Sequence, residues 1–385
     1  MQKIIILVIT CFVVTPTHCL ACLWDYDTLA MERQRFPYAH ELIAGHFLRH
    51  SNSYYEWRVV DRNKKTPMER TPANYDDLAV AYDKLGQHDK AIQTIREKIE
   101  RWPNESRYES EANLGTFLFH AGRLEEGLPH INRAIEINPD AHFGRELYQK
   151  LLVEYLLQQG YPNSKLPLNQ ENRDSPVGVG DGPVGFAQFV INAQQPKEED
   201  QQEELQRAAK GLLGMMRFGN YRSPVLLEAL GDLMLLMDDR HTDAKMLAAR
   251  AYLKASYEVQ DSIPSKRYRD KAKQVLELQP GYNLSQIEQD LKQEIEHGMA
   301  FFHQIKDDEK SWLAARKNLD HEYTEKYYNA TPPELSIPFW RNVSGSTRLK
   351  LFILSLLLGF VAVVFVTFMI LRKWIRSGTA HAQDA

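Results

Sequence analysis

The sequence predicts an all-α protein that consists of a helical solenoid, a second helical segment and one C-terminal transmembrane helix. Between residues 71 and 141, a pattern of small and large residues occurs twice with a constant spacing of 36 residues. On both sides of this repeat, apolar residues recur at helical spacing, which indicates amphipathic helices. Near the C-terminus, Leu351 to Leu371 form a run of 21 residues without a charge, long enough to cross a bilayer as one helix.

The composition is that of a globular chain without a basic surface. Of the 385 residues, 43% are hydrophobic and 25% are charged, and the net charge is −4. Nucleic-acid binding usually requires a basic patch or stripe, so we expect no nucleic-acid partner. Two of the 3 cysteines lie in the leader described next. Cys22 then remains alone, so the mature chain cannot form an intrachain disulfide.

Residues 1–21 have the layout of a secretory signal peptide. A lysine near the start precedes an apolar run, and small residues follow toward Ala21. The apolar run is short for a membrane span. Cleavage after Ala21 would place Cys22 at the N-terminus, where it is either a plain free thiol or a site of lipidation, as in bacterial lipoproteins. Cys19 stands where such a signal usually has leucine, which favours the free thiol.

Residues 22–71 are expected to form helices that cap the N-terminal end of the solenoid. An amphipathic run starts at Pro37. Ser53 and Glu56 stand three residues apart, as in a capping box, and predict a helix over 54–63.

The same segment contains the candidate metal ligands of the chain. His46 and His50 lie four residues apart, on one face of a helix, with His40 nearby. The glutamate of the zinc-binding HExxH motif does not accompany them, and no cysteine pair is available. Structural histidines are therefore preferred over ligands, and we expect no metal and no cofactor.

Residues 72–105 and 108–141 contain the two copies of the repeat, each expected to be a pair of packed helices. Small residues allow the two helices to approach, and large residues fill the space between them. Thr71 and Pro72 mark a helix start, because threonine is a good N-cap and proline suits the first helical position. The matched positions are Leu78 and Leu114, Ala79 and Gly115, Tyr82 and Leu118, Gly86 and Gly122, Ala91 and Gly127, Ile95 and Ile131, and Pro103 and Pro139.

This pattern resembles the tetratricopeptide repeat, a helix-turn-helix unit of about 34 residues. Two further residues separate the copies here, and Lys98 replaces a small residue of the unit. The resemblance implies a concave groove that binds a protein or peptide through first-helix side chains. The implied lining residues are Ala73, Asp76, Val80, Asp83, Glu109, Ala112, Thr116 and Phe119, with Glu228 and Asp232 from a third copy. Such a groove is acidic with one exposed aromatic residue and suits a basic peptide; alternatively, its carboxylates are solvated helix faces.

A capping helix is expected to complete this unit up to residue 160, because apolar residues recur every four positions from Phe143 to Tyr155. Residues 161–196 are rich in glycine and proline, which predicts a domain linker or an ordered loop. A Gly-x-Gly-x-Gly run from Gly178 to Gly182 lacks the spacing and the lysine of phosphate-binding loops. A turn is therefore the preferred interpretation.

Residues 197–263 are predicted to be helical and to contain a degenerate third copy of the repeat. Leu230, Gly231 and Met234 match the first half of the unit, and Tyr252 belongs to a second half that comes about five residues late. The methionines of this region are expected to fill gaps in a core.

The C-terminal third is predicted to lead to the membrane. Apolar residues spaced by three, four and seven over residues 264–330 predict a helical hairpin or short coiled coil that forms a stalk. Prolines make residues 331–348 an extended connector. A transmembrane helix is predicted over 349–371 and a short cytoplasmic tail over 372–385, because the leader exports the N-terminal bulk, into the periplasm if the host is a bacterium.

The expected function is a membrane-anchored scaffold or assembly factor that binds a partner protein through an exported repeat domain. One alternative is an envelope enzyme or metal-binding protein that uses the N-terminal histidines His40, His46 and His50, or an active site within residues 197–328, although no catalytic motif occurs in the sequence. Another is a structural protein that associates with itself through the stalk or the membrane helix.

Overall fold

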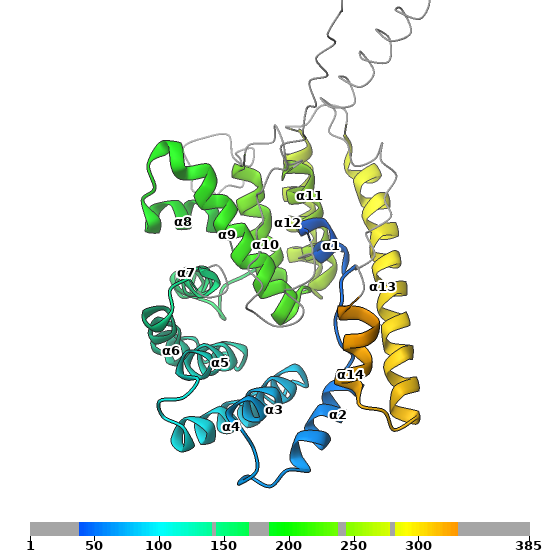
Figure 1. The fold of residues 1–385 in the computed structure, drawn as a ribbon. Coiled ribbons are helices and arrows are strands. Elements are labelled where there is room, and N and C mark those ends of the chain that lie inside the picture. Colours follow the sequence, from blue (N-terminus) through cyan, green and yellow to red (C-terminus); the bar gives the residue numbers. More distant parts are fainter. Residues whose placement is uncertain (1–37, 141–143, 169–184, 238–243, 278–281, 330–385) are drawn as a thin grey trace, which may run out of the picture.

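The computed structural model describes residues 38–140, 144–168, 185–237, 244–277 and 282–329, and every regular element in these ranges is a helix (Figure 1). The predicted all-α fold is therefore confirmed for these residues. The elements are α1 (Ala39–Ala44), α2 (Asn52–Asn63), α3 (Pro72–Lys84), α4 (His88–Arg101), α5 (Arg107–His120), α6 (Leu124–Ile137), α7 (Arg145–Gln158), α8 (Gly185–Gln194), η2 (Glu198–Asp200), α9 (Gln201–Met215), η3 (Met216–Asn220), α10 (Pro224–Leu236), α11 (Ala244–Glu258), α12 (Ser262–Glu277), α13 (Leu284–Ala314), α14 (Leu319–Tyr323) and η4 (Thr324–Tyr328).

Three predicted segments lie outside the described residues. They are the signal peptide with Cys22, the connector over residues 331–348, and the membrane helix with its tail. Within the described ranges, no helix combines the length and the apolar character needed to cross a bilayer.

The N-terminal segment folds as two short helices joined by an extended stretch. α1 ends at Gly45, whose φ of 77° is left-handed, and α2 begins after Ser51. The predicted capping box at Ser53 is wrong, because Ser53 already lies in the first turn of α2. Only α2 packs on α3 and covers the first hairpin, whereas α1 packs on α11 and α13.

α3 with α4 and α5 with α6 form two helical hairpins that pack on each other. Gly86 and Gly122 have φ values of 73° and 77° at the two equivalent turns, a conformation that glycine adopts without strain. The interior of the second hairpin is tight: a Cβ on Gly115 would lie 2.7 Å from Ile131, and one on Gly127 would lie 2.5 Å from the ring of Phe119. The matched small residues of the sequence are thus required for close helix packing.

Helices α7 to α12 build a second, larger helical body. α10 and α11 form the third hairpin, in which a Cβ on Gly231 would lie 2.5 Å from the ring of Tyr252. The predicted linker over 161–196 is wrong in its last part, where α8 lies. Phe186 is fully buried there, because this apolar helix packs against α7, α9 and α10. The predicted boundary at residue 263 falls within α12.

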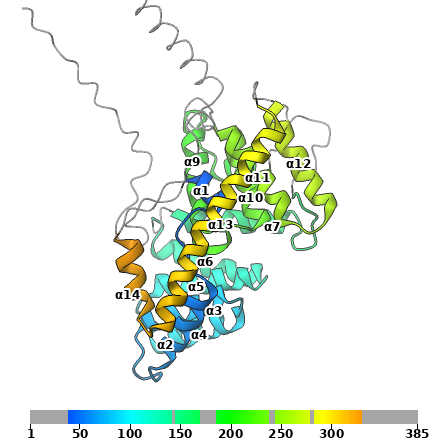
Figure 2. The same cartoon turned by 90° about the vertical axis from the view of Figure 1, so that its right-hand side faces the viewer.

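The long amphipathic stretch near the C-terminus consists of α13, a helix of 31 residues, and the short α14, which packs back on it. Helix α13 lies along the body of the molecule (Figure 2) and contacts α1, α2, α11, α12 and α14. At Gly298 the approach is close, since a Cβ there would lie 2.5 Å from the carbonyl oxygen of Ala44. The predicted stalk over 264–330 is therefore part of the body of the protein.

The helices follow one another around a closed circuit (Figure 1). The arc of α3 to α7 leads to α9, α10 and α11, and α13 connects α11 back to α2. A separate small hydrophobic core stabilises the place where the circuit closes, which is where the N-terminal segment contacts α13, α14 and η4. Its buried members are Leu48, Tyr54, Ile305, Trp312, Leu319, Tyr323 and Tyr327.

Candidate functional site

Asp76, the first predicted groove residue with a charge, is paired within the chain. Its carboxylate oxygens accept hydrogen bonds from Nζ of Lys98 at 2.8 and 2.7 Å, and one also accepts from Nδ2 of Asn113 at 3.2 Å. Lys98, which replaces a small residue of the repeat, is 0% exposed. Burial raises the pKa of Asp76 although the lysine and the amide bind its ionised form. This residue therefore connects α3 to α4 and α5.

Asp83, the second such residue, brings together two histidines from neighbouring helices. Its Oδ1 lies 2.8 Å from Nδ1 of His88, the first residue of α4, and its Oδ2 lies 2.9 Å from Nδ1 of His120, the last residue of α5. The side chain of Asp83 is 7% exposed, whereas the imidazoles are 33% and 35% exposed. Burial opposes ionisation, but hydrogen bonds from both histidines outweigh it and lower the pKa of Asp83.

The turn between α3 and α4 holds two members of this cluster in place. The N–H of Gly86 donates to the carbonyl of Asp83, and the N–H of Gln87 donates to that of Tyr82. These bonds satisfy the last carbonyls of α3 in the manner of a glycine C-cap. His88 follows directly, so its ring is positioned beside Asp83.

The remaining predicted groove residues do not form one exposed surface. Glu109 is exposed, and Val80 is partly buried against the small core of the hairpins. Thr116 accepts a hydrogen bond from Nε2 of Gln149 at 3.1 Å. Phe119 is partly buried, and its ring lies against Gly127. The expected exposed aromatic residue is therefore wrong, since this ring fills the second hairpin.

Glu228 and Asp232, assigned to the groove through a third copy, are core residues. Each is 1% exposed, and burial raises the pKa of Asp232. Their partners are Nζ of Lys271, the hydroxyls of Tyr252 and Tyr268, and the backbone N–H groups of Leu168 and Phe186. This buried network connects α8 and α12 to α10. The prediction that Glu228 and Asp232 line a binding groove is therefore wrong.

The N-terminal histidines are distributed along α13 and do not converge. Nε2 of His40 lies 2.8 Å from Oε2 of Glu294, and Nδ1 of His50 lies 2.9 Å from Oε1 of Glu309. His46 lies between them and stacks on Phe301 at a centroid distance of 4.8 Å; burial lowers its pKa. Their geometry supports the structural interpretation, since each ring contacts a different turn of one helix.

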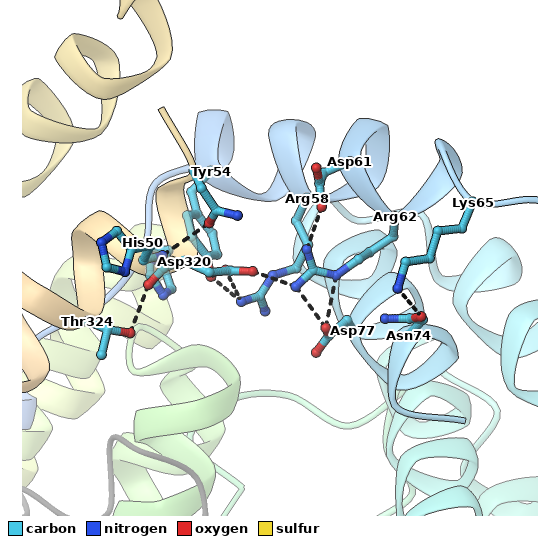
Figure 3. Close-up of polar contacts among 12 residues, drawn as sticks. His50, Tyr54, Arg58, Asp61, Arg62, Lys65, Asn74, Asp77, Asp320 and Thr324 are labelled. Carbon is cyan, nitrogen blue, oxygen red and sulfur yellow. Dashed lines mark hydrogen bonds and ion pairs between the residues drawn. The ribbon is translucent and has the colours of Figure 1, made fainter. Parts of the chain in front are cut away.

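Figure 3 shows how α14 is attached to α2. Asp320 accepts hydrogen bonds from the hydroxyl of Tyr54 at 2.5 Å, from Arg58 at 2.7 Å and from Arg62 at 2.5 Å. Arg62 also donates to Asp77 of α3 at 3.0 Å. Burial opposes ionisation of Asp320, but the charge of Arg58 and these hydrogen bonds hold its pKa well below its usual value. The network thus joins α2, α3 and α14.

A second polar contact lies deeper in the same closure. Glu309 is 0% exposed and accepts a hydrogen bond from the N–H of Ser51 at 3.0 Å. Burial raises the pKa of Glu309 to about 7. Burial also lowers the pKa of His50 well below its usual value, and the His50 ring stacks on Tyr54 at 3.4 Å. Below about pH 7 the pair is therefore held mostly as two neutral groups.

Lys84 links the first hairpin to the second helical body. Its Nζ donates to the carbonyls of Phe218 and, at 3.0 Å, Gly219. These carbonyls belong to η3, where the helix ends, and a cation is favourable at a helix C-terminus. Burial lowers the pKa of Lys84 to about 8. The amine of Lys84, the residue after Asp83, is thus directed toward η3.

Sequence reasoning identified Asp83 but missed His88 and His120. The two histidines are 32 positions apart, which no short motif describes. The repeat register contains the available signal: His88 follows Gly86 by two residues, and His120 precedes Gly122 by two. Helix turns of adjacent repeats lie side by side, so both side chains reach the same place.

Comparison with protein-family models, with curated protein sequences and with solved structures gives no match. Function must therefore be inferred from the chemistry and geometry of the molecule itself.

Proposed function

We propose that the protein is an exported, membrane-anchored scaffold that binds a partner protein through its helical repeats. The observation that carries this proposal is the pair of hairpins α3–α4 and α5–α6, which have equivalent glycine turns at a spacing of 36 residues. Together with the tetratricopeptide-like sequence pattern, this packing supports a repeat platform. Such repeats stack into solenoids and present extended concave surfaces for binding.

The partner-binding surface includes the exposed part of the wall formed by α3 and α5. Figure 1 shows these two helices toward the middle of the circuit and α4 and α6 on its outside. Since Asp76 and Asp83 are paired within the chain, exposed Glu109 is the best probe of this wall. On the outer side, a surface pocket is lined by Asp89, Ile92, Gln93, Arg96, Glu97 and Arg123.

The proposal is tested by crosslinking in native membranes followed by mass spectrometry. Glu109→Lys reverses a charge on the inner wall, and Glu97→Lys makes the same change on the outer helix α4. We expect a dominant partner that is lost from Glu109→Lys and kept by Glu97→Lys. Substitutions at Asp76 or Phe119 are unsuitable, because they would unpair buried Lys98 or open a space beside Gly127.

Two results would contradict the proposal at different levels. Loss of the partner only from Glu97→Lys would move the binding surface to the outer pocket. Absence of any partner from the wild-type sample would contradict the scaffold function itself.

A further inference from the structure

We propose that Asp83, His88 and His120 form a binding site for a divalent transition-metal ion, with zinc as the preferred ion. The site lies where the two hairpins meet, and it goes beyond the proposed partner binding. Within the described residues, these three are the one set of histidine, cysteine or acidic side chains that could together hold a metal. The ligand set is two imidazoles and one carboxylate.

The distances fit an ion with small adjustments. The three potential ligand atoms lie within 4.8 Å of one another. The carboxylate oxygens are 2.8 and 2.9 Å from the two Nδ1 atoms. Bonds of about 2.0–2.1 Å in a tetrahedral site place neighbouring ligand atoms about 3.3 Å apart, so each imidazole has to withdraw by roughly half an ångström. An ion would then occupy the place of the protons that now join the three groups.

The environment provides both a preformed ligand and access. Asp83 is buried and fixed by the Gly86 turn, while the two imidazoles are each about one-third exposed. Water can therefore complete the coordination from the solvent side, as in zinc sites with three protein ligands. Lys84, the neighbour of Asp83 in the chain, does not occupy the site, because its amine donates hydrogen bonds to the carbonyls of Phe218 and Gly219.

The ligand chemistry selects the class of ion. Imidazole nitrogen suits zinc, copper, iron and nickel, whereas magnesium and calcium prefer oxygen ligands. Because the ligands come from α3, α4 and α5, a bound ion would also crosslink the two hairpins. Metal binding would thus rigidify the platform to which the partner is proposed to bind.

A histidine–carboxylate contact within the second hairpin, between α5 and α6, provides a matched control. Nδ1 of His130 lies 2.7 Å from Oε2 of Glu111, and its side chain is 22% exposed. This pair contains one imidazole only. His130→Gln therefore removes a comparable contact from the same part of the fold without removing a proposed ligand.

The test is a calorimetric titration of the purified full-length chain, prepared without a polyhistidine tag and treated with EDTA, with Zn²⁺ alone. We expect one site of micromolar or tighter affinity in the wild type and in His130→Gln. We expect its affinity to fall at least about tenfold in Asp83→Asn, His88→Gln and His120→Gln, since even outer-shell changes cost 10–100-fold. Far-UV circular dichroism verifies that each variant is folded.

X-ray absorption of the zinc-loaded wild type gives an independent readout. Two imidazoles with oxygen ligands are expected, and one imidazole fewer in His88→Gln. The side chain of His88 is 33% exposed, so we expect this variant to remain folded. The proposal is overturned if the wild type has no such site, if the three ligand variants bind as the wild type does, or if His130→Gln weakens the same site equally.

Discussion

At the scale of residues, Lys98 departs from the repeat pattern and takes part in a polar contact that joins the two hairpins. Lys98 occupies a position where the repeat has a small side chain, yet it is fully buried. Its amine donates a hydrogen bond to the carboxylate of Asp76, and Asn113 donates to the same carboxylate. A buried charge is tolerated only with such partners. Asp76 consequently serves packing between the hairpins.

Lys98→Met is expected to destabilise the protein by about 2–3 kcal/mol. The change leaves a largely buried carboxylate without its cation, and breaking one side of a buried ion pair costs about 3–5 kcal/mol; the side chain of Asp76 is 22% exposed, which reduces the effect. Urea unfolding measures it. The double variant Lys98→Met with Asp76→Asn should regain part of the loss, and a single variant within about 0.5 kcal/mol of wild type would contradict the role of this pair.

At the scale of elements, short α14 has an effect out of proportion to its length. Asp320 accepts hydrogen bonds from three side chains of α2. Leu319 and Tyr323 pack in the small core beside α13. The helix has 5 residues, too few for independent stability in water. Its position therefore depends on these tertiary contacts.

Asp320→Asn is expected to loosen α14 and η4 more than the rest of the protein. Arg58 and Arg62 would keep their charges but lose their shared acceptor, so we expect a global loss of about 2 kcal/mol, below the value for a fully buried pair because the side chain of Asp320 is 30% exposed. Hydrogen exchange should become faster in residues 319–328. Asp61→Asn, which changes another carboxylate bound by Arg62, is the control; equal exchange in both variants would refute this role of Asp320.

At the scale of the whole molecule, the closed circuit makes the N-terminal segment part of the C-terminal body. His40, His46 and His50 contact α13 at points about two turns apart, and Ser51 donates to buried Glu309. Residues more than 250 positions apart are thereby held together. Titratable groups at this closure should connect the stability of the entire fold to pH.

Glu309→Gln is expected to become more stable relative to wild type as the pH rises from 5 to 8. The folded pKa of Glu309, about 7, lies above its ordinary value of 4.5. Folded wild type thus retains a proton that the unfolded chain has released, and its stability falls as pH rises through this window. Glutamine removes this loss, about 2 kcal/mol between pH 5 and 8 at 1.36 kcal/mol per pKa unit.

Urea unfolding at both pH values measures this difference. His50, whose pKa is lowered by burial, contributes the opposite slope below pH 6.5 in both proteins. Exposed Glu296, also on α13, provides the control: Glu296→Gln should follow the wild type at both pH values. A constant offset between Glu309→Gln and wild type would show that Glu309 does not titrate in this range.

Sequence patterns predicted the hairpins well but the candidate site only in part. Gly86, Gly115 and Gly127 act locally, through a turn or through packing within one hairpin, so their spacing is visible in the chain. The sequence spacing does not show which side chains will pair with a given carboxylate, because such partners can come from other helices. Asp83 and Asp232 are both acidic residues on a predicted first helix, yet one meets two accessible imidazoles and the other lies in a buried network.

The sequence by itself determined that the described protein is helical and that two hairpins repeat, because helical periodicity, caps and glycine turns depend on neighbours within a few tens of residues. Only the tertiary structure decided that α8 is a packed helix, that α13 belongs to the body, and that His88 and His120 meet at Asp83. Those outcomes depend on which surfaces the circuit brings together. Burial and pairing change the chemistry of a side chain only after distant elements have packed around it.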